Sequence, residues 1–128
     1  MSLAQSKRTM LVIDDDRAIL RSFSRIFEKK GYFVSTAETG KEAQEKLSKQ
    51  TYDATLVDIK LSDMNGADLL PFMREIAPNM VKIVISGLPS FEIAYQAAVN
   101  GADAFLSKPV HPEILFEVLD RKLKEKGF

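Results

Sequence analysis

Five apolar runs alternate with five amphipathic segments along this chain, and this alternation limits the possible folds more than any other feature. Short apolar runs bounded by polar residues are typical of strands that are buried on both faces. The segments between them carry apolar side chains three and four positions apart, as amphipathic helices do. Regular alternation of strand and helix predicts an α/β fold with a parallel sheet, right-handed crossovers and helices on both faces.

Residues typical of helix ends set the boundaries of these elements. Asp16 and Ser90 are predicted N-caps, and Gly31 and Gly101 are predicted to end the helices that precede them. Pro71 is expected close to a first helical turn, where proline is tolerated. Strands are predicted over residues 9–13, 32–37, 52–59, 81–86 and 102–107. Helices are predicted over residues 17–30, 41–49, 67–77, 91–100 and 112–123, of which 41–49 has the weakest periodicity.

The composition is that of one ordinary globular domain. The 128 residues suffice for a single core, with residues 1–8 expected to be flexible and residues 9–126 to form the domain. Eighteen basic and eighteen acidic residues cancel, which argues against direct contact with nucleic acid or a membrane. The chain lacks cysteine, an apolar run of about 20 residues and a signal-peptide core, so a cytoplasmic protein is expected.

Polar residues stand at the carboxyl ends of four of the predicted strands. Asp14 and Asp15 follow the first strand, Asp58 and Ser86 end the third and fourth, and Lys108 follows the fifth. Parallel strands have their carboxyl ends at one edge of the sheet, where ligands bind in open α/β folds. These five side chains are therefore expected to meet.

The chemistry of this set points to phosphoryl transfer. Three carboxylates repel one another and raise each other's pKa values unless a divalent cation lies among them. Oxygen ligands without histidine or cysteine favour Mg²⁺ or a similar hard ion, which usually partners a phosphate. A carboxylate beside Mg²⁺ can attack phosphorus, while Ser86 donates a hydrogen bond and Lys108 supplies positive charge. We therefore expect Asp58 to accept a phosphoryl group.

Each of these residues also has a simpler structural explanation when it is taken alone. The acids over residues 14–16 could be a favourable charge cluster at a helix N-terminus. Ser86 could be a turn residue, Lys108 a solvated charge, Phe105 a core residue and His111 a loop or capping residue. Complementary groups at four strand ends favour the functional interpretation for the set, whereas His111 is expected to have no chemical role.

The motifs at these strand ends resemble those of the receiver domains of two-component response regulators. The resemblance covers the chain from about Arg8 to about Lys124, and the motifs are jointly specific in residue type, order and spacing. The family implies a flavodoxin-like five-stranded parallel sheet of strand order 2-1-3-4-5. The matching segments are Leu11–Asp16, Leu56–Gly66, Val84–Gly87 and Gly101–Pro109.

The resemblance implies how the acids of this site act. Asp58 would accept the phosphoryl group from the phosphohistidine of a sensor histidine kinase or a phosphotransfer protein. Asp15 and Asp58 would bind Mg²⁺ directly, and Asp14 would bind it through water. The backbone carbonyl of Lys60 would complete the metal site.

The resemblance also implies a two-state switch. Ser86 would move to bond the phosphoryl group, Lys108 would pair with it, and Phe105 would occupy the position of an aromatic switch residue. Their movement would change the surface formed by the last two helices and the strand between them. The bond between Lys108 and Pro109 would be cis, which proline makes accessible.

Several positions near the site are expected to distinguish this receiver from others. Ser62 stands where the family usually has proline, which predicts a looser loop. Gly87 replaces a common alanine, and Phe105 replaces the commoner tyrosine, so a switch here cannot use a phenol hydroxyl. None of these changes removes a reacting group. Lys60 and Leu88 are expected to flank the phosphoryl group and to gate the attacking water.

Two other functions are possible on the same fold. One is an interaction module that works without phosphorylation, and the less favoured one is a Mg²⁺-dependent phosphohydrolase. Phosphohydrolases usually have a second acid two residues beyond the nucleophile, where this chain has Lys60, and a cap domain for which it is too short. A signalling domain rather than an enzyme is expected. The output is left open between an effector domain beyond residue 128, a separate target protein and a homodimer formed on activation.

Overall fold

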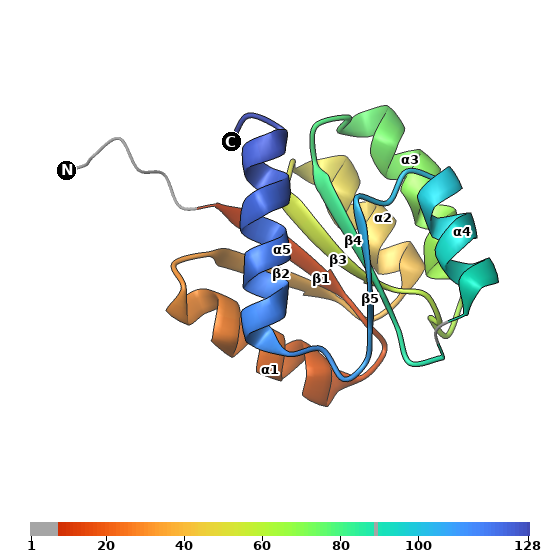
Figure 1. Cartoon of the computed structure of the whole chain (residues 1–128), viewed down its shortest axis with the longest axis horizontal. Coiled ribbons are helices and arrows are strands. Elements are labelled where there is room, and N and C mark those ends of the chain that lie inside the picture. Colours follow the sequence, from red (N-terminus) through yellow and green to blue (C-terminus); the bar gives the residue numbers. More distant parts are fainter. Residues whose placement is uncertain (1–7, 89) are drawn as a thin grey trace.

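The five apolar runs form one parallel sheet in the order β2-β1-β3-β4-β5, as the resemblance implies (Figure 1). This computed structural model describes residues 8–88 and 90–128, so the segment predicted to be flexible lies outside it except for Arg8. The strands are β1 (Thr9–Ile13), β2 (Phe33–Ala37), β3 (Ala54–Asp58), β4 (Val81–Ser86) and β5 (Ala104–Ser107).

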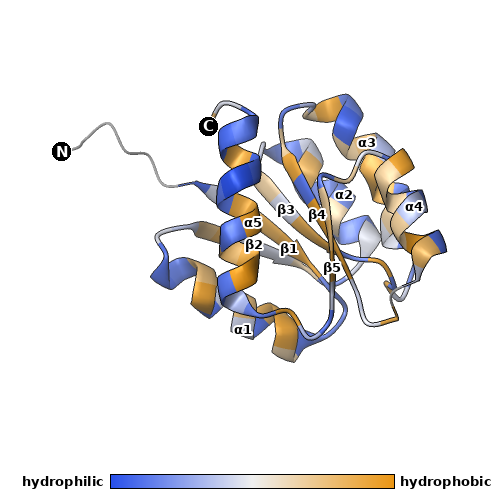
Figure 2. Ribbon diagram, viewed as in Figure 1, coloured by the Kyte–Doolittle hydropathy of each residue, from blue (hydrophilic) through white to orange (hydrophobic). Residues whose placement is uncertain are grey.

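Helices cover both faces of the sheet. On one face α1 and α5 pack against the side chains of β1, β3 and β4, and on the other face α2, α3 and α4 do so. Figure 2 shows that β1 and β4 are predominantly hydrophobic, as expected for strands covered on both sides. In the described part of the chain no helix is long and apolar enough to cross a membrane. The helices are α1 (Arg17–Lys29), α2 (Gly40–Lys49), the 3₁₀ helix η1 (Gly66–Asp68), α3 (Leu69–Ile76), α4 (Phe91–Val99) and α5 (Pro112–Glu125).

The residues predicted to cap and to terminate helices are confirmed in these roles. The Asp16 side chain accepts hydrogen bonds from two N–H groups of the first turn of α1, and Ser90 Oγ accepts one from the first turn of α4. Gly31 and Gly101 follow α1 and α4 with φ of 93° and 106°, a conformation that L side chains rarely adopt. Pro71 is the third residue of α3 and lies in its first turn, as predicted.

Several predicted boundaries are wrong because side chains bind the backbone at strand and helix ends. The third strand starts at Ala54 rather than at residue 52, since Asp53 instead accepts a hydrogen bond from Thr9 N (2.8 Å). The fifth starts at Ala104 rather than at residue 102, since Asp103 binds a backbone N–H of β4 (2.7 Å). The helix predicted from residue 67 begins as η1, capped by Asn65, and becomes α-helical only at Leu69.

One lysine is buried in the sheet at the edge opposite the predicted site. Lys82 in β4 is only 2% exposed, and its Nζ donates a hydrogen bond to the Met80 carbonyl (3.0 Å). Burial lowers the pKa of Lys82, and the charge of Asp103 opposes this shift. Asp103 lies 3.8 Å from Lys82 Nζ and 3.2 Å from Lys126 Nζ, so it joins β4 to the last turn of the chain.

Candidate functional site

The carboxyl ends of β1, β3 and β5 bring together the charged residues that the sequence predicts. Asp14 follows β1, and its backbone N–H donates to Ala37 O of β2 (3.1 Å), which fixes it at the sheet edge. Asp58 is the last residue of β3 and Lys108 directly follows β5. The parallel sheet therefore brings these side chains together as predicted, because the carboxyl ends of its strands lie at one edge.

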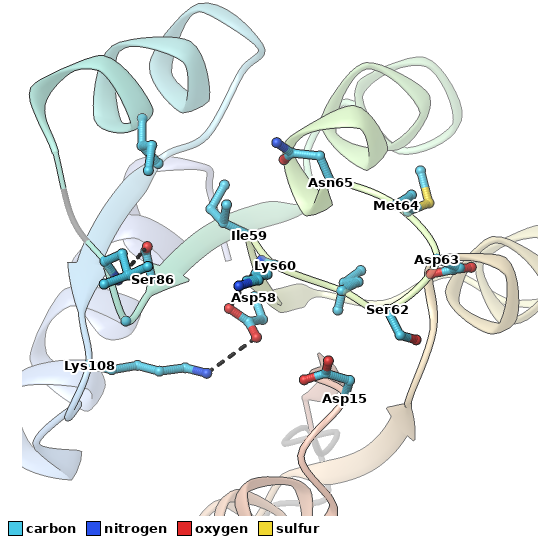
Figure 3. Close-up of a pocket in the computed structure, with 14 residues that line it drawn as sticks. Asp15, Asp58, Ile59, Lys60, Ser62, Asp63, Met64, Asn65, Ser86 and Lys108 are labelled. Carbon is cyan, nitrogen blue, oxygen red and sulfur yellow. Dashed lines mark hydrogen bonds and ion pairs between the residues drawn. The ribbon is translucent and has the colours of Figure 1, made fainter.

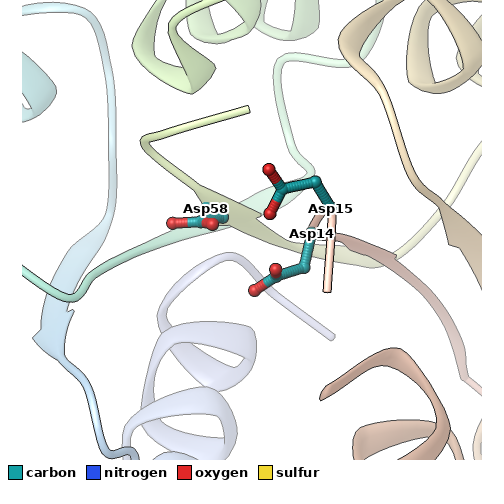
Figure 4. A group of neighbouring side chains, drawn as sticks. All are labelled: Asp14, Asp15 and Asp58. Carbon is teal, nitrogen blue, oxygen red and sulfur yellow. The ribbon is translucent and has the colours of Figure 1, made fainter. Parts of the chain in front are cut away.

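Three carboxylates lie together at this edge (Figure 4). One oxygen from each of Asp14, Asp15 and Asp58 lies within 4.8 Å of the other two. Asp14 and Asp58 are buried, whereas Asp15 is exposed. Buried carboxylates need a compensating partner, because the loss of hydration disfavours their charge.

Lys108 supplies part of this compensation. Its Nζ lies 3.2 Å from Asp58 Oδ2, with a hydrogen bond between them (Figure 3), and 3.1 Å from Asp14 Oδ2. The contact with Asp14 is close enough for an ion pair but is not aligned as a hydrogen bond. Asp14 Oδ2 is thus the one buried side-chain polar atom among residues 8–88 and 90–128 that lacks a hydrogen bond. Burial lowers the pKa of Lys108, but the two aspartates outweigh it and the net pKa is raised.

The pKa of Asp58 is raised above its ordinary value. Burial is the largest cause, and the charge of Asp14 is the second. The charge and hydrogen bond of Lys108 act in the opposite direction, as does the N–H of Lys60, which lies 3.4 Å from Asp58 Oδ1. The repulsion predicted among the acids is therefore present at Asp58, although the loss of solvent contributes more.

The donor set fits a hard divalent cation. When all three carboxylates are ionised, they and the one ammonium group have a net charge of minus two, which one divalent cation would balance. The cluster offers oxygen ligands and no imidazole or thiolate, as Mg²⁺ prefers. The buried Asp14 Oδ2, which has an ion pair with Lys108 but no hydrogen bond, is the kind of atom that a metal ion or its bound water satisfies.

Ser86 lies beside the carboxylates, but Phe105 does not reach them. Ser86 ends β4, is buried, and lines one open pocket of about 810 Å³ with Asp58 and Lys108. Its Oγ accepts a hydrogen bond from Leu88 N (3.2 Å). Phe105 is half-buried and packs against the core on the side of α2, α3 and α4. A role for Phe105 would therefore be indirect.

The connection from β5 to α5 also has the predicted form. The bond between Lys108 and Pro109 is cis. Lys108 N donates to Ser86 O (2.8 Å), so the backbone that carries the ammonium group is bound to the end of β4. His111 precedes α5 without a side-chain capping hydrogen bond, and it is not among the residues that line the pocket.

The loop that leaves Asp58 lines the same pocket and is held at both ends. Lys60 pairs with Asn65 in an antiparallel bridge, and Gly66 N donates to Ile59 O (2.6 Å). The side chain of Asp63 accepts hydrogen bonds from the first turn of α2. These contacts argue against the looser loop expected from Ser62. No local sequence pattern connects Asp63 with a helix that starts 23 residues earlier, so this contact could not be predicted from the sequence.

A model of one protein family matches most of the chain. The model of the response regulator receiver domain matches residues 10–120. This chain belongs to the receiver domain family. The receiver is 34% identical over 114 residues to the alginate biosynthesis transcriptional regulatory protein AlgB of Pseudomonas putida, with 89% of the chain and 25% of AlgB covered. The receiver thus spans about a quarter of the length of this curated relative.

Solved structures confirm the fold. The receiver is similar to a CheY-like response regulator receiver domain protein from Methanospirillum hungatei JF-1, with a TM-score of 0.91 and 40% identity, covering 94% of this chain and 97% of the other. It is also similar to the beryllofluoride-activated NtrC4 receiver domain dimer, with a TM-score of 0.87 and 33% identity, covering 93% and 98%. The receiver fold, its strand order and its class as a signalling domain of response regulators are therefore established.

Proposed function

We propose that this receiver accepts a phosphoryl group on Asp58 from the phosphohistidine of a sensor histidine kinase or a phosphotransfer protein. The observation that carries the proposal is the setting of Asp58. This buried carboxylate lies at a strand end, in a pocket, beside two further carboxylates and 3.2 Å from Lys108 Nζ. Few structural roles need that combination, whereas phosphoryl transfer uses every part of it.

The transfer forms one bond and breaks one. An oxygen of Asp58 attacks phosphorus as the P–N bond of the donor breaks, and the electron pair of that bond stays on the departing imidazole. Lys108 then pairs with the phosphoryl oxygens from its position at the end of β5. Asp15, Asp58 and the Lys60 carbonyl would hold Mg²⁺ directly and Asp14 would hold it through water, and the ion would supply positive charge beside the transferring oxygens.

Phosphorylation acts on the rest of the receiver through Ser86. The new group adds roughly two negative charges, and the Ser86 hydroxyl turns to donate a hydrogen bond to a phosphoryl oxygen. Because Ser86 Oγ accepts the N–H of Leu88 (3.2 Å), this movement pulls on the segment that enters α4. Phe105 repacks on β5 in response. The charge stabilises one arrangement of α4, β5 and α5 more than the other, which shifts the balance between them.

Chemical phosphorylation tests the proposal. Incubation with acetyl phosphate and Mg²⁺ is expected to add one phosphoryl group, seen by intact-protein mass spectrometry, and EDTA is expected to prevent it. If neither acetyl phosphate nor a histidine kinase labels the protein, the proposal is wrong. Steady release of phosphate from small esters would instead indicate a phosphohydrolase. Failure to bind Mg²⁺ would indicate an interaction module that needs no phosphorylation.

The output of the domain belongs to a larger system. The receiver covers about a quarter of AlgB, so we propose that it controls an effector domain beyond residue 128 or a separate target protein in the cytoplasm. Because the receiver has a net charge of zero, we expect any contact with nucleic acid to be made by such an effector rather than by the receiver. Formation of a homodimer on activation is a further part of the proposal, supported by the dimer of the similar NtrC4 receiver.

The surface of α4 is expected to take part in that dimer. Phe91 and Tyr95 are 86% and 58% exposed and stack with ring centroids 6.4 Å apart. Replacing both by serine is expected to weaken dimerisation of the beryllofluoride-treated protein about tenfold or more, because exposed aromatic side chains dominate such contacts. Sedimentation velocity measures this. Ile76→Ser, an exposed apolar position on α3, is the control and should dimerise normally. Equal dimerisation of both variants would contradict the assignment.

The lifetime of the phosphorylated state is expected to depend on Lys60 and Leu88. Both line the pocket around Asp58, and Leu88 is 72% exposed, so neither is fixed by the core. Replacing both by alanine is expected to speed dephosphorylation about tenfold, or about 1.4 kcal/mol of barrier, because water reaches the phosphoryl group more easily. Ser62→Ala, in the same pocket, is the control. An unchanged rate of phosphate loss in the double variant would exclude this gating.

A further inference from the structure

The loop that leaves Asp58 is fastened to a helix from another part of the chain. Asp63, at the tip of this loop, accepts hydrogen bonds from Gly40 N at Oδ1 (2.8 Å) and from Lys41 N at Oδ2 (3.0 Å). These N–H groups belong to the first turn of α2, where a helix has no partners of its own for them. They hold the pKa of Asp63 below its ordinary value.

Asp63 completes a cap that the local sequence of α2 leaves unfinished. The local N-cap, Thr39, binds Glu42 N through its Oγ1 (3.0 Å) and Ala43 N through its carbonyl (3.0 Å). Within residues 8–88 and 90–128, the N–H groups of Gly40 and Lys41 donate hydrogen bonds only to Asp63. A carboxylate at a helix N-terminus also interacts favourably with the helix dipole.

A packing contact joins the same two segments. Met64 follows Asp63 and lies so close to Gly40 that a Cβ atom there would be 1.9 Å from Met64 Sδ. Within the loop, Leu61 N donates to Met64 O (3.2 Å), and Lys60 pairs with Asn65. Figure 3 shows the loop that leaves Asp58 with Asp63 at its tip, and the hydrogen bonds to Gly40 N and Lys41 N place this tip against the start of α2. A displacement of Asp63 would therefore also displace the backbone of Lys60, including its carbonyl group.

We propose that Asp63 is a positioning residue that sets the Mg²⁺ affinity of the site through the peptide of Lys60. The inference rests on the proposed function, in which the Lys60 carbonyl is a metal ligand. Lys60 N lies 3.4 Å from Asp58 Oδ1, and Leu61 N, which shares a peptide group with the Lys60 carbonyl, donates to Met64 O next to Asp63 (3.2 Å). Asp63 holds the loop against α2 and keeps that carbonyl in place before the metal binds. Without Asp63, metal binding has to order the loop first and is weaker for that reason.

Linkage gives this proposal a second consequence that needs no phosphorylation. If the contact between Asp63 and α2 strengthens Mg²⁺ binding, then bound Mg²⁺ must strengthen that contact by the same factor. Amide hydrogen exchange at Gly40 and Lys41 is therefore expected to slow on addition of Mg²⁺. These amides lie on α2 and make no direct contact with the three carboxylates of the site, since both donate to Asp63.

The experiment compares three single variants of the full chain by calorimetric titration with Mg²⁺. Asp63→Ala is expected to raise the dissociation constant about tenfold, as loss of a residue that orients a metal ligand does. Asp63→Asn keeps one acceptor oxygen and is expected to fall between Asp63→Ala and the wild type. Asp68→Ala is the control, since this exposed aspartate makes no side-chain capping hydrogen bond and should bind as the wild type does.

The outcomes separate this inference from the proposed function. If Asp63→Ala binds Mg²⁺ as tightly as Asp68→Ala, or if Mg²⁺ leaves exchange at Gly40 and Lys41 unchanged in the wild type, the positioning role is wrong while the phosphoacceptor function stands. If the wild type itself binds no Mg²⁺ and accepts no phosphoryl group, the proposed function fails. Circular dichroism of each variant without Mg²⁺ reports the total helix content and the thermal unfolding, so a general folding defect is recognised directly.

Discussion

Asp58→Asn is expected to abolish labelling by acetyl phosphate or by a histidine kinase. The amide has nearly the same shape as the carboxylate but lacks the nucleophilic anion, so no acyl phosphate forms. The loss should exceed about a thousandfold, since a residue that forms the covalent intermediate has no substitute. The variant should also bind Mg²⁺ less tightly, because one of three carboxylates of the cluster is gone. Intact-protein mass spectrometry after incubation with the donor and Mg²⁺ measures the labelling.

Asp16→Asn is the matched control for this substitution. Asp16 lies close to the same cluster in the sequence but is exposed and caps α1 through its side chain. Asparagine caps helices as well as aspartate does, so the control changes charge without changing structure. It should be labelled normally. Full labelling of Asp58→Asn under the same conditions would show that Asp58 is not the acceptor.

Gly66→Ala is expected to destabilise the domain by about 3 kcal/mol, at the upper end of the range for overpacking. A Cβ atom on Gly66 would lie 2.0 Å from the backbone carbonyl oxygen of Asp58. Backbone atoms of a central strand cannot move aside as a flexible side chain can. Gly66 is not among the described glycines with positive φ, so the cause is space rather than conformation. Thermal unfolding should show a decrease in Tm of about 10 °C.

Gly87→Ala is the control for this prediction. Gly87 lies in the loop after β4 and lines the pocket around Asp58. Among the described residues, a Cβ atom on Gly87 would contact only Lys108 Cδ, at an ordinary distance of 3.8 Å. Its φ is not positive either. The substitution should therefore be neutral or stabilise by about 0.5 kcal/mol through the unfolded chain. Equal stability of the Gly66 and Gly87 variants would show that the backbone of η1 can move away from Asp58 at little cost. The close contact between Gly66 and Asp58 would then not constrain the loop.

Elements whose causes are local were predicted well from the sequence. The caps at Asp16 and Ser90 act within one helical turn, and periodicity reports burial within one segment. The helix of weakest periodicity was also correct, since Ala43 and Leu47 are both buried in α2. Its first turn also donates two hydrogen bonds to Asp63, which lies outside the segment, so the periodicity of the segment could not show this contact.

Errors arose where a distant side chain binds the backbone. The carboxylates of Asp53 and Asp103 bind strand N–H groups and so shorten β3 and β5 relative to the apolar runs. The face of α4 was equally hidden from sequence reasoning. In α4 the apolar residues Phe91, Tyr95 and Val99 are exposed, and Ala97 is the one buried residue of the helix. Burial depends on which elements pack against a helix, which its own sequence does not state.

The sequence by itself determined the strand order through the family resemblance, and it determined which polar side chains gather at the strand ends. Both rest on short-range patterns, and parallel strands carry their ends to one edge without further information. Only the tertiary structure decided how tightly Lys108 contacts Asp14 and Asp58, and which helix holds the loop after Asp58. Those contacts join residues far apart in the chain, and their geometry depends on packing distances of a few tenths of an ångström that no local pattern encodes.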